Sequence, residues 1–322
     1  MLKRFRLASI LLIIALALSL AVSCDLDLGF DPPAPTPAPT PAPEPSPEPT
    51  PDPSDLGQTE ANTCYYNQLT EEEKEIYREI LADMLIYDFD VDFTGAFDYD
   101  KDRSKTEKAF VALTADRPDL FWMGRGYDYH IFAEKWMISI KRNVETDELI
   151  EANKILIENK LNQIRTYISL NADLEDDASI AKALYDYLVL YATYDSRTLE
   201  EQTMLGIMVN LRGVCASFAA AYQYVLQSYG IPCIFIGGTG IVPPDEGGPH
   251  AWNAVQINGS WYLVDVTWGQ NATAEGTPED YHYKEGLAID YTWLCRSDVF
   301  MITTHIPSEL YFSPECPEDY IF

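Results

Sequence analysis

Basic residues are scarce in this 322-residue chain: 22 Lys and Arg stand against 51 Asp and Glu, and the formal net charge is −29. A surface of this kind repels phosphate backbones and anionic lipid headgroups. We therefore expect no nucleic-acid partner. The acidic surface could favour cationic substrates such as lysine-bearing peptides, although solubility is the simpler explanation of the charge.

Metal-binding templates are also missing. The six cysteines include no CxxC pair and no Cys and His spacing typical of a zinc site. The acidic stretch from Asp88 to Asp102 invites comparison with a calcium loop, but Phe93 and Tyr99 stand where such a loop needs Gly and Glu. A count that begins at Asp98 fails in the same way. We predict no metal and no cofactor, and an exposed edge or loop at these acids.

The N-terminal apolar run, residues 7–22, is shorter than the roughly 20 residues that a spanning helix needs. It follows a basic start and ends in Leu20-Ala21-Val22-Ser23-Cys24, which resembles the lipobox of bacterial lipoproteins. We predict a signal peptide over residues 1–23 and a lipid on Cys24, with plain cleavage nearby as the alternative. The mature chain, with a net charge of about −32, would then be anchored to the cell membrane on its extracellular face.

Proline gathers in one segment, because 12 of the 21 prolines lie in residues 31–53. Alternating proline removes backbone donors and fixes φ, so this segment predicts an extended polyproline stalk within residues 24–58. The stalk would hold the folded part clear of the membrane. About 265 residues remain, enough for a real core. We divide them into an α+β module over residues 59–145 and a catalytic domain over residues 146–322.

Several helices and strands can be read from local patterns. Thr70 and Glu73 form a capping box that opens a helix with apolar positions at Tyr77, Ile80 and Met84. Periodicity predicts further helices over residues 105–113, 147–168 and 178–191, and strands over 121–122, 127–132 and 135–141, the last two joined by a hairpin.

Cys215 is predicted to begin a helix, since residues 216–226 are rich in helix formers and a Gly closes the run at Gly230. Unpaired N–H groups at a helix start stabilise a thiolate, which is the nucleophilic form of cysteine. Cys233 lies instead inside the apolar strand predicted over residues 231–237, where it is a packing residue. For Cys215 taken alone, a small buried hydrophobic residue is the alternative.

A hairpin links the two other candidate catalytic residues. Asn258-Gly259 is the strongest short hairpin signal, and counting back from a two-residue turn pairs Trp252 with Asp265. His250 then becomes the diagonal neighbour of Asp265 on one face of the sheet, about 7–8 Å away and within reach of a hydrogen bond. A one-residue bulge would put the two side chains on opposite faces.

These three residues suit an acyl transfer in which Cys215 is the nucleophile, His250 the base and Asp265 the residue that orients the base. The backbone N–H of Cys215 is a candidate donor to the oxyanion. Asn210 is a candidate for the second donor, with a structural loop cap as the alternative.

Two tryptophans and two cysteines complete the list of candidates. Trp252 and Trp268 flank the predicted triad and are candidates for the wall of the substrate site, although core packing is the commoner role at such positions. Cys64 and Cys316 lie near the two ends of the folded part, and export would permit a disulfide between them.

The segments GVCASFA (213–219), HAWNAV (250–255) and WYLVDVTW (261–268) resemble the transglutaminase-like core, over about residues 180–270. More loosely, the whole chain is similar to bacterial lipoproteins that carry this core. The resemblance implies a papain-like α+β fold in which the cysteine helix packs on an antiparallel sheet. It also implies catalytic roles for Cys215, His250 and Asp265.

A thioester on Cys215 can pass to water or to an amine. We expect a cysteine peptidase or amidase that acts on peptide or isopeptide bonds, with cell-wall peptide as one substrate, and a crosslinking transglutaminase is the alternative. Arylamine N-acetyltransferases share the order Cys, His, Asp, but acetyl-CoA is not available outside the cell. A catalytically idle module that binds a wall component or another ligand is the non-enzyme alternative.

Overall fold

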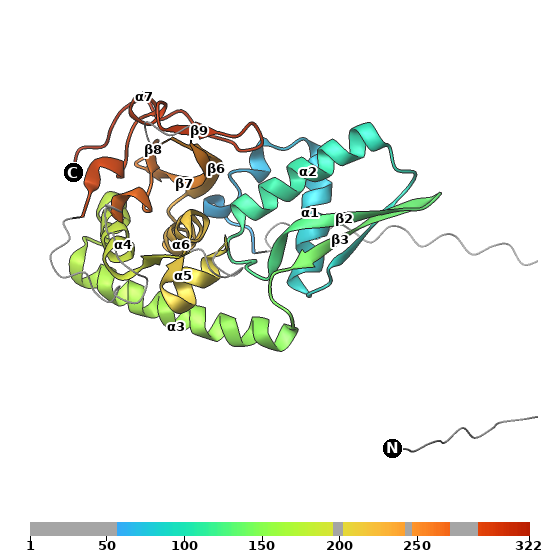
Figure 1. Ribbon diagram of the computed structural model, residues 1–322, viewed down its shortest axis with the longest axis horizontal. Coiled ribbons are helices and arrows are strands. Elements are labelled where there is room, and N and C mark those ends of the chain that lie inside the picture. The colour runs from blue at the N-terminus through green and yellow to red at the C-terminus, as the bar shows by residue number, and fades with distance from the viewer. Residues whose placement is uncertain (1–56, 196–201, 242–246, 271–288) are drawn as a thin grey trace, which may run out of the picture. The chain divides into compact units, whose positions relative to one another are not determined.

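The computed structural model describes residues 57–195, 202–241, 247–270 and 289–322 (Figure 1). The predicted signal peptide, Cys24 and most of the proline-rich stalk lie outside the described residues. The described chain has an α+β fold, in which helices pack on two antiparallel sheets. None of its described helices combines the length and the apolarity needed to cross a bilayer.

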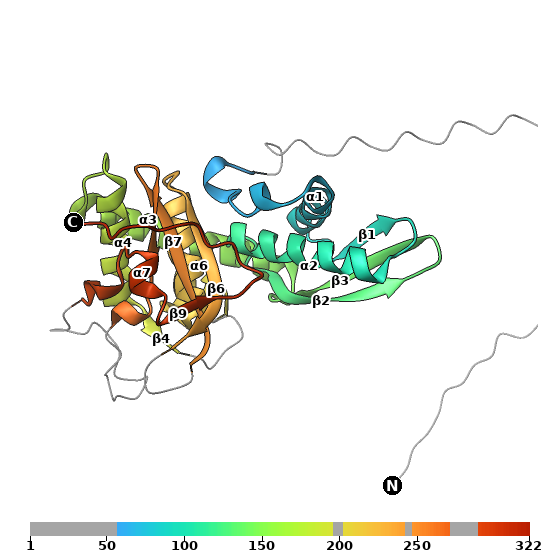
Figure 2. The same cartoon turned by 90° about the horizontal axis from the view of Figure 1, so that it is seen from above.

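The first part of the fold is a three-stranded sheet, in the order β1-β3-β2, with helices α1 and α2 packed together beside it (Figure 2). Its main elements are α1 (Glu71–Leu85), β1 (Asp90–Thr94), α2 (Tyr99–Asp116), β2 (Met123–Ile131) and β3 (Lys135–Arg142). The predicted capping box is confirmed, because Thr70 N–H donates to Glu73 Oε2 over 2.8 Å and Glu73 N–H donates to Thr70 Oγ1 over 3.4 Å.

The acidic stretch in this part forms an edge strand and a helix cap. β1 is the edge strand, and its acids point outward in alternation with buried Val91 and Phe93, as the sequence predicted. Helix α2 begins at Tyr99, six residues before the predicted start, because the Asp98 carboxylate accepts hydrogen bonds from the first backbone N–H groups of the helix. The strand predicted over residues 121–122 is wrong, since both residues lie in a turn.

The second part is built from helices that lead into a four-stranded antiparallel sheet. Two short 3-10 helices, η5 (Trp268–Gln270) and η7 (Tyr291–Trp293), lie between the third and the last strand of that sheet along the chain. The remaining elements are α3 (Asp147–Asn171), α4 (Asp177–Tyr191), β4 (Thr193–Tyr194), α5 (Met204–Asn210), β5 (Arg212–Gly213), α6 (Cys215–Gln227), β6 (Cys233–Gly240), β7 (Gly248–Ile257), β8 (Ser260–Val264), α7 (Asp298–Met301) and β9 (His305–Pro307).

The sheet runs in the order β8-β7-β6-β9, and α6 packs against β6 and β7, with α7 on the opposite side in Figure 2. A cysteine helix on an antiparallel sheet is the arrangement that the resemblance implied. The strand β9 comes from the C-terminal region and pairs with β6, so segments far apart in the sequence meet at this edge.

The hairpin of β7 and β8 has the predicted register. Asn258 and Gly259 have φ values of 51° and 82°, the left-handed conformation that a tight two-residue hairpin turn requires. Ile257 pairs with Ser260, and no bulge interrupts the ladder up to the pair of Asn253 and Val264. The ladder stops one pair short of residue 265, whose N–H donates to Trp293 O over 2.9 Å.

One hydrophobic core extends through both parts of the described chain. The Tyr65 hydroxyl lies 2.6 Å from Phe235 O and 2.9 Å from Phe312 O, and Gln227 Nε2 donates to Asp116 O over 3.2 Å. These contacts join the N-terminal segment and α2 to the sheet and helix that carry the candidate site. The boundary between residues 145 and 146 stays a prediction.

Asp116 is the buried polar anchor of this junction, because its carboxylate accepts hydrogen bonds from Tyr65 N–H at 2.9 Å and Tyr66 N–H at 2.8 Å. Replacing it in an Asp116→Ala variant leaves two buried donors without an acceptor. We expect the free energy of unfolding to fall by about 2–4 kcal/mol. Urea denaturation followed by circular dichroism measures this change.

The loss of stability in the Asp116→Ala variant should depend on pH. Burial raises the pKa of Asp116 to about 7, against the opposing hydrogen bonds from Tyr65 and Tyr66. The folded chain therefore holds this proton more tightly than the unfolded chain, and the contribution of Asp116 declines as the pH rises from about 4 to 7. The gap between wild type and Asp116→Ala should be larger at pH 5 than at pH 8. Asp128→Ala, at an exposed strand position, is the control and should change stability by less than about 0.5 kcal/mol.

Candidate active site

Cys215 is the first residue of α6, as the sequence predicted. The chain reaches it through the short parallel pair β4 and β5, in which Thr193 N–H donates to Leu211 O over 2.8 Å and Asp195 N–H donates to Gly213 O over 2.7 Å. Cys215 itself is half-buried. As the first residue of a helix its N–H has no intrahelical acceptor, and no other acceptor for it occurs in the described part of the chain.

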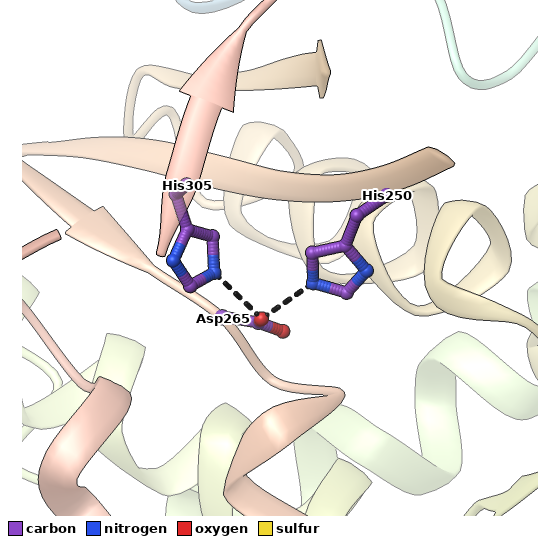
Figure 3. Close-up of side chains that lie close together, drawn as sticks. All are labelled: His250, Asp265 and His305. Carbon is purple, nitrogen blue, oxygen red and sulfur yellow. Dashed lines mark hydrogen bonds and ion pairs between the residues drawn. The ribbon is translucent and has the colours of Figure 1, made fainter. Parts of the chain in front are cut away.

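His250 and Asp265 meet as the hairpin register predicted. His250 Nε2 lies 2.7 Å from Asp265 Oδ2, and the carboxylate is fully buried (Figure 3). The other ring nitrogen, Nδ1, does not face Asp265, and the Cys215 thiol is near enough to the ring to help raise the pKa of His250. The imidazole of His250 therefore lies between the Asp265 carboxylate, which it contacts, and the Cys215 thiol, which affects its pKa.

A second histidine, which the sequence did not predict as a site residue, forms a hydrogen bond with the same carboxylate oxygen. His305 comes from β9, is almost fully buried, and places Nε2 3.0 Å from Asp265 Oδ2, on the side opposite His250 (Figure 3). The third donor to this carboxylate is Trp268 N–H, which reaches Oδ1 over 3.1 Å. The only local signal was a histidine in an otherwise uncharged segment, and its partner lies 40 residues away in the sequence.

The other ring nitrogen of His305, Nδ1, also has a hydrogen-bond partner. Thr304 Oγ1 lies 2.9 Å from His305 Nδ1 and 3.1 Å from Met301 O. A hydroxyl has one proton to donate, so it goes either to the imidazole or to the carbonyl. In both arrangements His305 Nε2 carries the proton that faces Asp265, because an ionised carboxylate can only accept.

The charges of His250 and Asp265 stabilise each other. Burial alone would lower the pKa of His250, but the Asp265 carboxylate and the hydrogen bonds to Asp265 and Cys215 outweigh it and raise this pKa well above the usual histidine value. Burial alone would raise the pKa of Asp265, yet the hydrogen bonds and charges of His250 and His305 hold it below the usual carboxyl range. Near neutral pH the arrangement favours an imidazolium next to a carboxylate.

The two candidate wall residues differ in exposure. Trp252 is buried, stacks on the His250 ring at 6.0 Å, and has an Nε1 without a hydrogen-bond partner in the described residues. Trp268 is half-buried, with its ring centroid 5.2 Å from that of His250 and 4.5 Å from that of His305. Trp252 is thus part of the core behind the histidines, whereas Trp268 can reach the surface beside them.

Other candidates do not join this cluster. Asn210 is the last residue of α5 and is exposed, and no hydrogen bond within the described residues links it to Cys215. Its role as an oxyanion donor stays a prediction. Cys64 and Cys316 are free thiols, so the disulfide considered between them does not form in this structure.

His250, Asp265 and His305 could also chelate a metal, since their ligating atoms lie within 4.8 Å of one another. Both imidazole nitrogens that face the carboxylate are already at hydrogen-bond distance from it. The hydrogen bonds among these three side chains therefore form without a metal ion.

The sequence around this cluster is similar to a known superfamily. Residues 167–266 match the model of the transglutaminase-like superfamily. The match spans Cys215, His250 and Asp265, whereas His305 lies beyond its end.

Individual relatives are distant. Mouse (Mus musculus) kyphoscoliosis peptidase is 23% identical over 163 residues, which cover 46% of this chain and 24% of that protein. The LIM and transglutaminase domain protein ltd-1 of Caenorhabditis elegans is 22% identical over 139 residues, or 38% of this chain and 19% of that protein. The chain thus spans about a quarter or less of the length of these curated relatives. Among solved structures, the crystal structure of a TGase is 15% identical with a TM-score of 0.33, over 62% of this chain and 56% of that one.

The electrostatic coupling of His250 to Asp265 predicts a specific titration. In wild type, the ring nitrogen signals of His250 should remain those of an imidazolium between pH 6 and pH 8, because its pKa is raised. In Asp265→Asn the carboxylate charge is gone and the same signals should titrate at a lower pH. Nitrogen-15 NMR of the imidazoles measures both, and a wild-type midpoint near the ordinary value of about 6.5 would contradict the pairing.

Proposed function

We propose that this chain is an extracellular, membrane-anchored enzyme that transfers acyl groups through a thioester on Cys215, and that it acts as a cysteine peptidase or amidase on peptide or isopeptide bonds. The observation that carries the proposal is the hydrogen bond between His250 and Asp265 beside the Cys215 thiol, within the residues that match the transglutaminase-like superfamily. Peptide or protein is the substrate class, and cell-wall peptide fits a protein held outside the cell on a stalk.

The location rests on the sequence. The basic and apolar N-terminus and the lipobox-like segment before Cys24 support export and lipid anchoring, and the proline-rich segment supports a spacer. Under this proposal residues 24–58 connect the membrane to the folded part, residues 59–145 form an N-terminal α+β module, and residues 146–322 carry the chemistry.

The first half of the reaction starts from a thiolate on Cys215 and an imidazolium on His250, because the thiol proton already lies on the ring. The thiolate then attacks the carbonyl carbon of the substrate, and the oxyanion that forms accepts a hydrogen bond from the Cys215 backbone N–H. The carbon–nitrogen bond breaks as the His250 imidazolium protonates the leaving amine. The acyl group is left on sulfur as a thioester.

In the second half, water bonds to the acyl carbon and gives its proton to His250. The carbon–sulfur bond breaks and the acid is released. The proton from water stays on His250, so the thiolate and imidazolium are restored and one water is consumed for each amide cleaved. An amine in place of water would give a crosslink by the same steps. We favour water, because a stalked extracellular protein meets it at far higher concentration than any one amine.

The roles of Asp265 and His305 follow from their contacts. Asp265 holds the His250 ring with Nε2 toward the carboxylate and Nδ1 toward the thiol, and it stabilises the imidazolium. His305 is a positioning residue: it donates to the same oxygen from the other side and keeps the carboxylate ionised and in place. It touches neither the thiol nor, in this proposal, the substrate.

The first test asks which bond is broken and by which thiol. The mature chain should cleave members of a quenched fluorescent peptide and isopeptide library, Cys215→Ala should lose at least about a thousandfold in rate, and Cys64→Ala should retain the wild-type rate. Activity should survive EDTA, since no step uses a metal. Cleavage that persists in Cys215→Ala, or that stops with EDTA and returns with zinc, would refute the mechanism.

Two further measurements separate the alternatives. Stable incorporation of a fluorescent amine into a glutaminyl peptide, with little hydrolysis, would favour the crosslinking enzyme. Iodoacetamide at pH 6 should label Cys215 far faster than Cys64, whose pKa burial raises to about 12. Equal and slow labelling of both thiols would favour an idle binding module.

The positioning role of His305 has its own test. His305→Ala should lower kcat/KM at least tenfold and move the acid limb of the pH profile to higher pH, because the pKa of Asp265 rises when a donor is removed. His305→Gln, which keeps an N–H donor, should recover much of the rate. If His305→Gln and His305→Ala are equally impaired at equal thermal stability, the hydrogen bond to Asp265 is not what His305 contributes.

A further inference from the structure

A cavity of about 350 Å³ lies where the N-terminal part of the fold meets the helix of Cys215, and the mechanism above does not use it. Helix α2, the turn that follows it and strand β2 form one wall, while α5, α6 and β6 form the other. The wall is mainly apolar, and its large side chains are Phe110, Leu120, Phe121, Met123 and Phe235. This volume falls in the range of sites that bind small molecules or peptide side chains.

The cavity shares wall residues with the surroundings of Cys215. Helix α6 carries Cys215 at its first position and lines the cavity with Ala220 and Gln223. Phe235 and Tyr311 belong both to the cavity wall and to the apolar cluster that packs around Cys215. At 1.5 Å per residue, Gln223 stands about 12 Å along the helix from the thiol, a distance that an extended peptide covers in three or four residues.

Gln223 offers the cavity an unused hydrogen-bond acceptor. Its side chain is 1% exposed, and its Nε2 donates to Ala115 O over 2.6 Å, which fixes the direction of the amide. Its Oε1 has no donor among the described residues. Because a buried acceptor without a partner is costly, a ligand N–H is a natural partner for this oxygen.

Arg125 contacts both walls of the cavity. Its Nη2 donates to Gln202 O over 2.7 Å, and its guanidinium lies 5.8 Å from the Phe235 ring centroid. One residue of β2 thus contacts both the segment before α5 and the strand β6. The N-terminal part is therefore built into the wall of this cavity.

We propose that this cavity is a specificity pocket for the substrate of the proposed peptidase, and that it takes a large apolar side chain, aromatic or branched aliphatic, three or four residues from the scissile bond. A backbone N–H of the same stretch of peptide donates to Gln223 Oε1. The inference rests on the proposed function for the meaning of the scissile bond, but the binding itself does not need catalysis. The N-terminal part of the fold is then the element that selects the substrate.

The test measures binding in a Cys215→Ala chain, so that cleavage plays no part. Fluorescein-labelled hexapeptides with Phe, Leu or Ala at each position in turn are titrated and followed by anisotropy. We expect Phe or Leu at one position to bind at least tenfold more tightly than Ala there. Thr114→Trp, which fills the cavity from α2, should abolish this preference, and Thr166→Trp, at an exposed position of α3, should keep it.

A second measurement changes the ligand and leaves the protein fold intact. Each peptide N–H of the best hexapeptide is replaced in turn by an ester oxygen. Because Gln223 Oε1 needs a donor, the ester that removes the N–H facing this oxygen, near the apolar position, should weaken binding about tenfold. Esters at other positions should not weaken binding, unless the N–H that they replace pairs with a strand of the protein.

The outcomes separate this inference from the proposed function. No position with an apolar preference, or a preference that survives Thr114→Trp, would overturn the pocket even if Cys215 cleaves peptides. A preference that Thr114→Trp removes supports the pocket, even if the wild-type chain cleaves nothing and the proposed peptidase fails. An ester scan without a sensitive position would remove the role of Gln223.

Discussion

The carboxylate of Asp265 is the group on which the candidate site depends. A fully buried negative charge is tolerated in a protein interior only when donors surround it, and Asp265 has three: two imidazoles and one backbone N–H. These donors come from β7, from β9 and from the 3-10 helix η5 that follows β8. The Asp265 carboxylate therefore links β7, β9 and η5 to the segment after β8 that contains Asp265 itself, close to Cys215.

Much of this arrangement is local in the sequence, and so it was predictable. The hairpin turn at Asn258-Gly259 needs positive φ at two positions, and a two-residue turn leaves only one pairing for the strands on either side. That pairing brings His250 to Asp265 without any knowledge of the rest of the fold. The start of α6 at Cys215 was likewise visible in a run of helix formers.

The rest required information that no short segment contains. His305 reaches Asp265 because β9 adds to the edge of β6, a pairing between strands some 65 residues apart that no local pattern signals. The early start of α2 was missed because a cap at Asp98 outweighed the weak periodicity of the first two turns. The cavity between α2 and α6 was invisible for the same reason as β9, since its two walls are distant in sequence and meet only through the shared core.

The late position of β9 in the chain has a consequence for how the protein comes into being. On a ribosome, Cys215, His250 and Asp265 emerge well before His305, so for a time the growing chain contains the carboxylate but lacks one of the two imidazoles that donate to it. Burying Asp265 at that stage would leave its charge only partly compensated. Strand β9 thus completes the set of donors to Asp265 only after the hairpin that contains His250 and Asp265 has been synthesised.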